Sequence, residues 1–240
     1  MKSVTSIQLA EHPYAEQIID TFNGFTIEIC LRDSSMNTAF HLRYRSYLAV
    51  GSITENKEEM LYDEYDFSPN ARIHLVWHEG KAVATIRSCV YSDHYNWVPT
   101  EGIRYFRDTV NQELGRTTRI LESNRFAVDP DFQGRQSLFA QFLLFRAHGL
   151  NAGAHGCSHI ITSVRSHHRA FYLRFLGMEP VSEQAVYIPW VDAEVYLLAN
   201  ETESCLSAIL KRGMPDYDQD DISRYARKAQ LPVRQQTLAA

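Results

Sequence analysis

The residues that most strongly indicate chemistry are a carboxylate and a guanidinium inside a predicted apolar strand. Glu122 and Arg125 lie within Ile120–Val128, where a central strand is normally built from Val, Ile and Leu. Charged groups in such a strand are costly unless they are paired or take part in function. The strand leads through Asp129-Pro130 and the turn Gln133–Arg135 into a long apolar helix, a junction whose free backbone N–H groups can hold a phosphate. These residues therefore predict an enzyme that binds a phosphate-bearing donor beside a central strand.

The elements that must position this strand follow from the spacing of apolar residues. Their order predicts an α/β fold, a mixed sheet with helices on its faces. In the helix that opens at the capping signal Asp33–Ser35, Phe40 and Tyr44 lie on one face and Arg43 lies close to its edge. We expect helices over residues 10–22, 33–48, 101–114, 136–151 and 168–176, a hairpin over residues 73–91, and strands over residues 25–32, 120–128, 158–165, 186–190 and 194–199.

The composition shifts at about residue 200. Residues 1–200 hold the predicted sheet, and residues 201–240 hold one amphipathic helix, the acidic run Asp216–Asp221, another short helix and a polar tail. The acidic run resembles the start of a calcium loop, but its sixth position is Asp221 rather than Gly and its twelfth is Arg227 rather than Glu. We therefore expect a solvated linker there, in an extension that is separate from the main domain.

Composition and cysteine usage predict a soluble cytoplasmic protein. The chain has 240 residues and is 45% hydrophobic and 22% charged, as ordinary globular domains are. No run approaches the roughly 18 apolar residues of a membrane span, and Met1–Gln8 lacks the apolar core of a signal peptide. The four cysteines stand far apart with no C-x-x-C spacing, which is typical of reduced thiols.

Positive charge is concentrated in one part of the chain. The net charge is −5, yet residues 116–174 hold eight arginines against three acidic residues, with five histidines in addition. Such a local excess can steer an acidic partner, while the alternative is a set of solvated helix faces. Nucleic acid is disfavoured because the chain has no Lys/Arg blocks and no recognisable binding motif.

Two segments, together with the order of the elements, resemble the GNAT acyltransferase fold. The first is Val128–Arg135 leading into a helix, and the second is Arg169–Met178, which is similar to the closing helix of that family. The resemblance implies that Tyr172 faces the departing thiol, and the alternative is that this tyrosine only covers the core. The adjacent pair His167 and His168 is the alternative acid/base group.

A narrower resemblance is to acyl-homoserine-lactone autoinducer synthases and to the closely related N-acyl amino acid synthases. It spans roughly residues 38–180 and implies acyl transfer from a thioester to an amine. It rests on the order and spacing of Arg43, Tyr47, Asp63, Asp66, Arg87 and the run Glu122–Phe126. The substrate-binding residues that it implies are Arg43, Tyr47, Arg87, Arg125, Phe126 and Val128.

One departure from the GNAT pattern concerns the acyl donor. GNAT enzymes that use coenzyme A usually have a turn with two or three glycines around a pyrophosphate, but Gln136 and Leu138 stand where further glycines are expected. Gln133, Gly134 and Arg135 would then hold a single phosphate, which favours the phosphopantetheine arm of an acyl carrier protein. The acidic surface of carrier proteins would also suit the arginine-rich region.

A second departure concerns the acceptor. Autoinducer synthases usually carry a Trp six residues beyond the aromatic residue that matches Tyr47, near the site for S-adenosylmethionine. This chain has Ile53 at that position. The difference favours a plain amino acid as the acceptor.

Acyl transfer to an amine needs a base, a stabilised oxyanion and a proton for the leaving thiol. Glu122 is the candidate base, directly or through a water, if burial raises its pKa. The alternative is a structural anchor that forms an ion pair with Arg43 or Arg87. In a regular strand residues 122 and 125 point to opposite faces, so they converge only through a β-bulge, which the GNAT resemblance implies.

The remaining groups follow from the same chemistry. Backbone N–H groups near Phe126–Val128 are the candidate oxyanion donors. Arg43, Arg87 and Arg125 either bind the carboxylate of the acceptor or pair with nearby carboxylates. Four phenylalanines line an acyl groove or belong to the core: Phe139, Phe142, Phe145 and Phe175.

The sequence therefore predicts an N-acyltransferase that moves a fatty acyl group from an acyl carrier protein to the α-amine of an amino acid, with no tightly bound cofactor and no metal. One alternative is an acyl-homoserine-lactone synthase that uses S-adenosylmethionine, and another is a GNAT acetyltransferase that uses coenzyme A. A catalytically silent module that binds carrier protein or lipid is a further alternative, and Glu122→Gln would leave its function untouched.

Overall fold

The fold is built around one mixed sheet of nine strands. The computed structural model describes residues 17–95, 100–189 and 192–229. The strands run in the order β1-β2-β3-β4-β5-β6-β9-β7, and β8 also pairs with β9. Within the described residues only the β5–β6 pair is parallel. The strands are β1 Ile18–Phe22, β2 Phe25–Ile29, β3 Ala71–His78, β4 Lys81–Tyr91, β5 Ile120–Val128, β6 His159–Arg165, β7 Glu179–Pro180, β8 Val186–Ile188 and β9 Ala193–Glu201.

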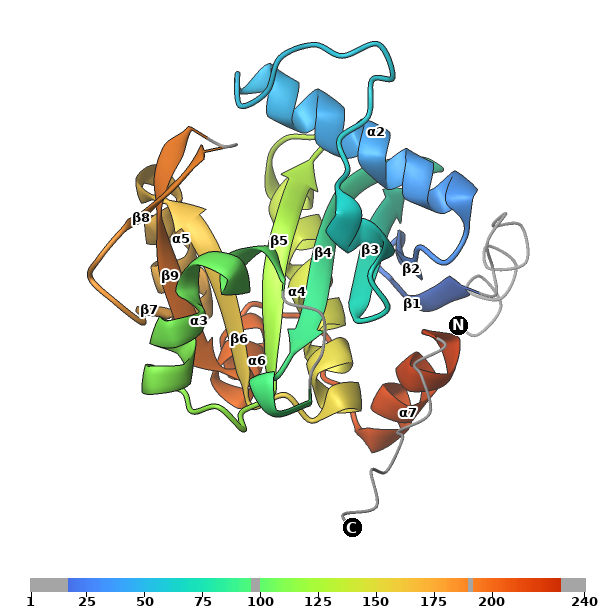
Figure 1. Cartoon of the computed structure of the whole chain (residues 1–240). Coiled ribbons are helices and arrows are strands. Elements are labelled where there is room, and N and C mark those ends of the chain that lie inside the picture. Colours follow the sequence, from blue (N-terminus) through green and yellow to red (C-terminus); the bar gives the residue numbers. More distant parts are fainter. Residues whose placement is uncertain (1–16, 96–99, 190–191, 230–240) are drawn as a thin grey trace.

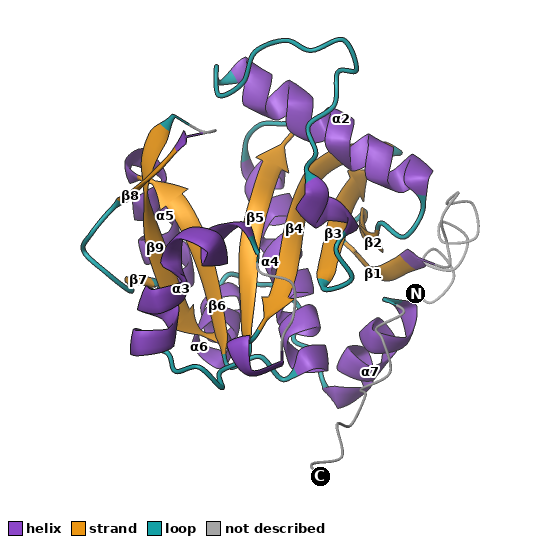
Figure 2. Cartoon of the chain, in the orientation of Figure 1, coloured by secondary structure: helices purple, strands orange, loops and turns teal. Residues whose placement is uncertain are grey.

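Helices cover both faces of the sheet (Figure 1, Figure 2). Helices α2 and α3 lie on one face, while α4, α5 and α6 lie on the other, with α7 packed beside α4. The largest apolar cluster lies between α4 and the sheet. No helix in the described part of the chain is long and apolar enough to cross a membrane. The helices are α2 Asp33–Ala49, α3 Glu101–Glu113, α4 Arg135–His155, α5 Arg169–Leu176, α6 Thr202–Leu210 and α7 Gln219–Lys228.

Two neighbouring strands diverge where the predicted polar residues lie. β5 and β6 are paired from Ile120 with His159 to Ser123 with Thr162. Beyond that point the two strands separate (Figure 1). Residues of both strands line the cavity described below, so the divergence of β5 and β6 creates the space for a ligand in the middle of the sheet.

The helix predicted over residues 10–22 is wrong where the structure describes this segment. Ile18–Phe22 forms strand β1, which pairs with β2, and residues 10–16 lie outside the described residues. The turn between the strands is Asn23-Gly24, with φ angles of 50° and 80°. An Asn-Gly pair with both φ angles positive is the preferred two-residue hairpin turn, and β-branched and aromatic residues before it favour a strand.

The described residues beyond 201 pack against α4. A Cβ on Gly149 would collide with the side chains of Leu206 and Tyr217, so this glycine permits the close approach. The solvated linker predicted over Asp216–Asp221 is wrong in its second half. The carboxylate of Asp218 accepts hydrogen bonds from the backbone at the start of α7 and caps this helix. The division of the chain into two domains at residue 200 stays a prediction.

Candidate active site

Strand β5 contains the bulge that the convergence of its charged residues requires. On β4 one residue separates Thr85 from Arg87, whereas on β5 two residues, Arg125 and Phe126, separate their ladder partners. Arg125 has a φ of 52°, in the left-handed region. The bulge therefore turns the guanidinium of Arg125 toward the face of the sheet that carries Glu122, as predicted.

The carboxylate of Glu122 is buried against the N-terminus of α3. It accepts hydrogen bonds from the backbone N of Gly102 at 2.9 Å and from Nδ2 of Asn124 at 3.1 Å, and it contacts the hydroxyl of Thr100. Only 1% of the residue is exposed. Burial raises the pKa of Glu122 to about 7, with a further rise from the negative charge of Glu101. The carboxyl can therefore change protonation state near neutral pH, as a general base must.

Gly102 makes room for this carboxylate. A Cβ on Gly102 would lie 2.8 Å from Oε1 of Glu122 and 2.9 Å from Oγ of Ser163. The Oγ atom of Ser163 is buried and has no hydrogen-bond partner among the described residues. The carboxylate on β5 and the hydroxyl on β6 thus converge on the first turn of α3.

An ion-pair network lies next to Glu122. Asp63 sits between Arg87 and Arg125, each with a guanidinium nitrogen 2.5 Å from its carboxylate oxygens. Asp66 sits between Arg43 and Arg87, at 2.8 and 3.1 Å. Burial acts to raise the pKa of Asp63, but the hydrogen bonds and charges of Arg87 and Arg125 outweigh it and hold the pKa well below its usual value. Asp63 therefore stays ionised and holds both arginines.

The ion pairs of this network count against the alternative in which Glu122 is a structural ion-pair partner of Arg43 or Arg87. In the described residues the ion pairs of Arg43 and Arg87 are formed with other carboxylates. Asn124 lies between the network and Glu122, because its Oδ1 accepts a hydrogen bond from Nε of Arg87 at 2.7 Å while its Nδ2 donates to Glu122. Arg43, predicted at the edge of its helix face, is fully buried instead, with its charge compensated by Asp66.

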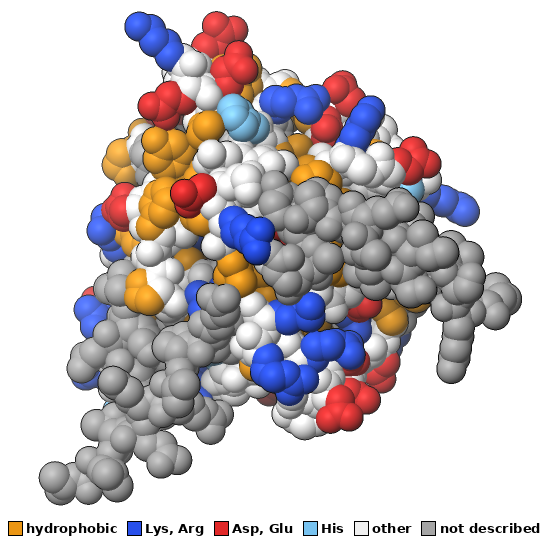
Figure 3. Space-filling view, turned by 90° about the vertical axis from the view of Figure 1, so that its right-hand side faces the viewer, with side chains coloured by type: hydrophobic (Ala, Val, Ile, Leu, Met, Phe, Trp, Pro, Cys, Tyr) orange, Lys and Arg blue, Asp and Glu red, His pale blue; other side chains and the backbone are white. Residues whose placement is uncertain are grey.

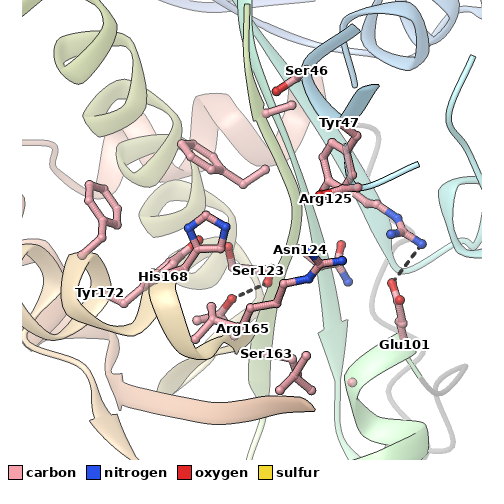
Figure 4. A pocket seen from close by; sticks show the side chains of 18 of the residues that line it. Ser46, Tyr47, Glu101, Ser123, Asn124, Arg125, Ser163, Arg165, His168 and Tyr172 are labelled. Atoms are coloured by element: carbon pink, nitrogen blue, oxygen red, sulfur yellow. Dashed lines mark hydrogen bonds and ion pairs between the residues drawn. The ribbon is translucent and has the colours of Figure 1, made fainter. Parts of the chain in front are cut away.

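A cavity of about 460 Å³ lies between the diverging strands, α2, α3 and α5 (Figure 4). Tyr172 on α5 is buried beside it, with its ring against Phe145, and burial raises the pKa of the phenol. The phenol therefore stays protonated at neutral pH. The predicted site residues that line the cavity are Tyr47, Glu122, Arg125, Phe126, Val128 and Tyr172. The predicted site residues that do not line it are Arg43, Arg87, Gln133, Gly134 and Arg135.

The predicted phosphate-binding turn lies at the start of α4. Gly134 is the N-cap residue with a φ of 82°, and no side chain among the described residues caps this helix. The side chains of Gln133 and Arg135 are exposed. Val128, the last residue of β5, lines the cavity, so the cavity extends toward this turn. An uncapped helix N-terminus can bind an anion, and the assignment of the turn to phosphopantetheine stays a prediction.

The arginine-rich segment does not form one surface patch. Arg125 and Arg146 are buried, Arg116 pairs with Asp93, and Arg119 donates a hydrogen bond to a backbone carbonyl. Figure 3 shows the side of the molecule that lies at the right of Figure 1, where basic and acidic side chains lie interspersed, whereas α5, which carries Arg169 and Arg174, lies at the left of Figure 1. The four remaining arginines are exposed or half-buried: Arg135, Arg165, Arg169 and Arg174. An acidic partner would therefore meet these four arginines and Arg116, which is exposed but shares its charge with Asp93.

The four phenylalanines belong to the core. Phe142 and Phe145 are buried in the cluster under α4, Phe139 and Phe175 pack against it, and none of the four lines the cavity. Phe171 lines it instead. His168, of the alternative acid/base pair, also lines the cavity, and burial lowers its pKa.

Sequence reasoning missed the residues that hold Glu122 in place. Thr100 and Gly102 lie at the start of α3, and Asn124 lies two residues beyond Glu122 in β5. A threonine followed by Glu101 was a signal for a helix start. The contact of this helix start with β5, however, joins residues 20 or more positions apart, which no local pattern reveals.

Comparisons with known proteins agree with this geometry. A family model described as N-acyl amino acid synthase FeeM matches residues 38–201. The chain belongs to this family. It is an acyltransferase of the N-acyl amino acid synthase type, as predicted. The family match ends directly before α6.

Solved structures share its GNAT-like fold. FeeM, an N-acyl amino acid synthase from uncultured soil microbes, matches with a TM-score of 0.63 and 18% identity, over 79% of this chain and 97% of FeeM. The acyl-homoserine-lactone synthase LasI matches with a TM-score of 0.61 and 15% identity, over 81% of this chain and 98% of LasI. The coenzyme A-dependent acyl-homoserine-lactone synthase BjaI matches with a TM-score of 0.55 and 14% identity, over 82% of this chain and 93% of BjaI. No sequence among the curated proteins matches the chain.

Proposed function

We propose that this member of the FeeM family transfers a fatty acyl group from the phosphopantetheine thioester of an acyl carrier protein to the α-amine of an amino acid. The observation that carries the proposal is the buried Glu122 carboxyl, whose pKa is raised to about 7, on the wall of a cavity of about 460 Å³. Tyr172, a protonated phenol, lines the same cavity. A base and a proton donor meet two of the three needs of thioester aminolysis, and the third is a site for the oxyanion.

The amine attacks the thioester carbonyl directly, in a ternary complex of enzyme, donor and acceptor. Glu122 takes a proton from the nitrogen, directly or through a water, and the nitrogen lone pair forms the new C–N bond. Backbone N–H groups near Phe126–Val128 stabilise the oxyanion. When the carbonyl forms again the C–S bond breaks, and Tyr172 gives its proton to the departing sulfur.

A carrier protein is the donor that the start of α4 favours. Gln136 and Leu138 occupy the first turn of α4, where a pyrophosphate-binding turn would have glycines. The exposed side chain of Arg135 at the same helix start is available to one phosphate. Acyl-coenzyme A is the second candidate donor, because the fold is shared with BjaI, which is described as coenzyme A-dependent.

An acyl-homoserine-lactone synthase is the second candidate function. It is favoured by the likeness of the fold to LasI. Ile53 counts against it, because it follows Ser52 of the cavity wall at the position where autoinducer synthases usually carry a Trp. The two functions differ in the acceptor, so the choice of substrate separates them.

The test is product analysis with purified protein. An acyl carrier protein and coenzyme A, each carrying the same fatty acyl chain, are offered together with either a mixture of amino acids or S-adenosylmethionine, and products are identified by mass spectrometry. We expect N-acyl amino acids from the carrier protein. Lactones formed only with S-adenosylmethionine would support the acyl-homoserine-lactone synthase instead. Product formed only from acyl-coenzyme A would contradict the carrier protein as the donor.

Two variants separate catalysis from folding in this assay. Glu122→Gln is expected to lower kcat/KM by about 10²- to 10⁴-fold, the usual contribution of a general base. The matched control is Glu28→Gln, because Glu28 is also a buried carboxyl with a pKa raised to about 7 but does not line the cavity. The control is expected to keep wild-type activity. Equal losses in both variants would contradict the assignment of Glu122 as the base.

A further inference from the structure

An amino acid acceptor needs a cation for its carboxylate, and two of the three predicted arginines cannot reach a ligand. Arg43 and Arg87 are each 0% exposed and do not line the cavity. Arg125 does line it, but Nη2 of Arg125 lies 2.5 Å from Asp63 and 3.3 Å from Glu101. All three arginines are therefore held by carboxylates of the protein itself.

Arg165 is the second arginine of the cavity wall. It is the last residue of β6, two residues beyond Ser163, and alternate residues of a strand share a face of the sheet. Ser163 and Glu122 both approach Gly102, with oxygens 2.9 and 2.8 Å from the point that a Cβ on Gly102 would occupy. Arg165 thus extends from the same face as the Glu122 carboxyl, at the end of β6 that has diverged from β5.

The side chain of Arg165 reaches into the cavity. Figure 4 shows it extending from β6 across the gap between the strands in the direction of Asn124, and both residues line the cavity. Among the described residues, Arg165 and Arg125 are the two arginines that line it. Arg165 is half-buried, and a guanidinium withdrawn in part from water binds a carboxylate with two directed hydrogen bonds.

We propose that Arg165 binds the α-carboxylate of the acceptor amino acid and so selects amino acids over simple amines. The inference rests on the proposed function and adds the residue that recognises the acceptor. The amine of the acceptor lies beside Glu122 and Ser163, and its carboxylate points along β6 toward Arg165. Arg125 orders the opposite wall through its ion pairs with Asp63 and Glu101.

The experiment compares two acceptors that differ only in the carboxylate. One is an amino acid that the purified enzyme acylates, and the other is its decarboxylated amine, such as phenylalanine and 2-phenylethylamine. With one acyl donor, Arg165→Met is expected to lower kcat/KM for the amino acid by about 10- to 100-fold, mainly through KM, as loss of a hydrogen bond to a charged group predicts. The value for the amine is expected to stay unchanged. Arg165→Lys keeps the charge but lacks the planar guanidinium, so its kcat/KM for the amino acid is expected to lie between those of the wild type and Arg165→Met.

The matched control is Arg224→Met on α7. Arg224 is exposed, pairs with Asp221, lies outside the arginine-rich segment and does not line the cavity, so both acceptors are expected to react as with the wild type. Thermal unfolding of each variant shows that the fold is intact. Equal losses for the amino acid and the amine, or no loss for the amino acid, would overturn the role of Arg165 and leave the acyltransferase in place. A wild-type enzyme that acylates neither acceptor from either donor would overturn the proposed function and this inference together.

Discussion

Replacing Glu122 by Gln is expected to lower kcat/KM by about 10²- to 10⁴-fold and, as the pH rises through 7, to gain stability relative to the wild type. The carboxyl is 1% exposed, and burial raises its pKa from the ordinary 4.5 to about 7. A base must be deprotonated to act, so wild-type kcat/KM is expected to fall about tenfold for each pH unit below 7. The burial that raises the pKa also makes the ionised carboxylate costly to fold.

The magnitude follows from the two pKa values. A rise from 4.5 to about 7 corresponds to about 3 kcal/mol, at about 1.4 kcal/mol for each pH unit. Below pH 4.5 the carboxyl is protonated in both the folded and the unfolded chain, so its full contribution to stability is present. Between pH 4.5 and 7 the unfolded chain ionises first and stability falls, and above pH 7 about 3 kcal/mol is lost. Gln cannot ionise, so the variant does not lose this free energy.

Urea unfolding of both proteins at pH 5 and pH 8 measures the effect. The difference in free energy of unfolding between Glu122→Gln and the wild type is expected to move by about 2.5 kcal/mol in favour of the variant between these pH values. For Glu28→Gln the difference in free energy of unfolding from the wild type is expected to change in the same direction, because burial raises the pKa of Glu28 as well. The activity of this variant is expected to stay at the wild-type level. A difference for Glu122→Gln that is the same at both pH values, or a wild-type kcat/KM that stays flat from pH 5.5 to 8, would refute the reasoning.

Three further substitutions test the contacts around the site. Gly102→Ala places a carbon 2.8 Å from Oε1 of Glu122, so kcat/KM is expected to fall at least about tenfold. The free energy of unfolding in urea is expected to fall by about 1–3 kcal/mol. Wild-type kinetics would contradict this geometry. Asp63→Asn leaves two buried guanidinium groups without their shared carboxylate and is expected to cost about 3–5 kcal/mol in the same assay. A loss of unfolding free energy below about 1 kcal/mol would show that the ion pairs contribute no more than exposed surface pairs do. Tyr225→Phe removes the 3.0 Å hydrogen bond to Nε2 of His74, far from the cavity, and is expected to cost about 1 kcal/mol with kcat/KM unchanged; a loss of activity would instead link α7 to catalysis.

The central strand was predictable because its signal is local. The apolar run with charged interruptions gave the bounds Ile120–Val128, and the structure has the same bounds for β5. The bulge at Arg125 was expected from the resemblance to GNAT enzymes and depends on pairing with β4, which lies more than 30 positions earlier in the chain. The Asn23-Gly24 turn is a local signal as well, and it indicates a hairpin. The prediction of a helix over residues 10–22 did not take this signal into account, and the structure has strand β1 there.

The burial of charge could not be predicted from spacing. Periodicity placed Arg43 at the edge of a helix face, but Asp66, 23 positions later, compensates its charge and allows full burial. The support of Glu122 by Thr100 and Gly102 likewise joins β5 to the start of α3. A pattern that repeats every two or four residues shows which face a residue occupies, whereas its ion-pair partner comes from the tertiary fold.

Two carboxyl groups of the site, Asp63 and Glu122, have pKa values shifted in opposite directions, and the difference lies in which groups surround them. Asp63 receives two guanidinium groups, which hold its pKa well below the usual value, while Glu122 receives neutral donors in a buried position, and its pKa rises to about 7. Environments that push two carboxyl groups apart assign them different roles. A direct ion pair between Arg87 and Glu122 would favour the ionised carboxylate and weaken it as a base. Asn124 occupies the position between the two side chains, with its oxygen toward Arg87 and its nitrogen toward Glu122. A neutral amide thus separates the proposed base from the arginines that would otherwise keep it ionised.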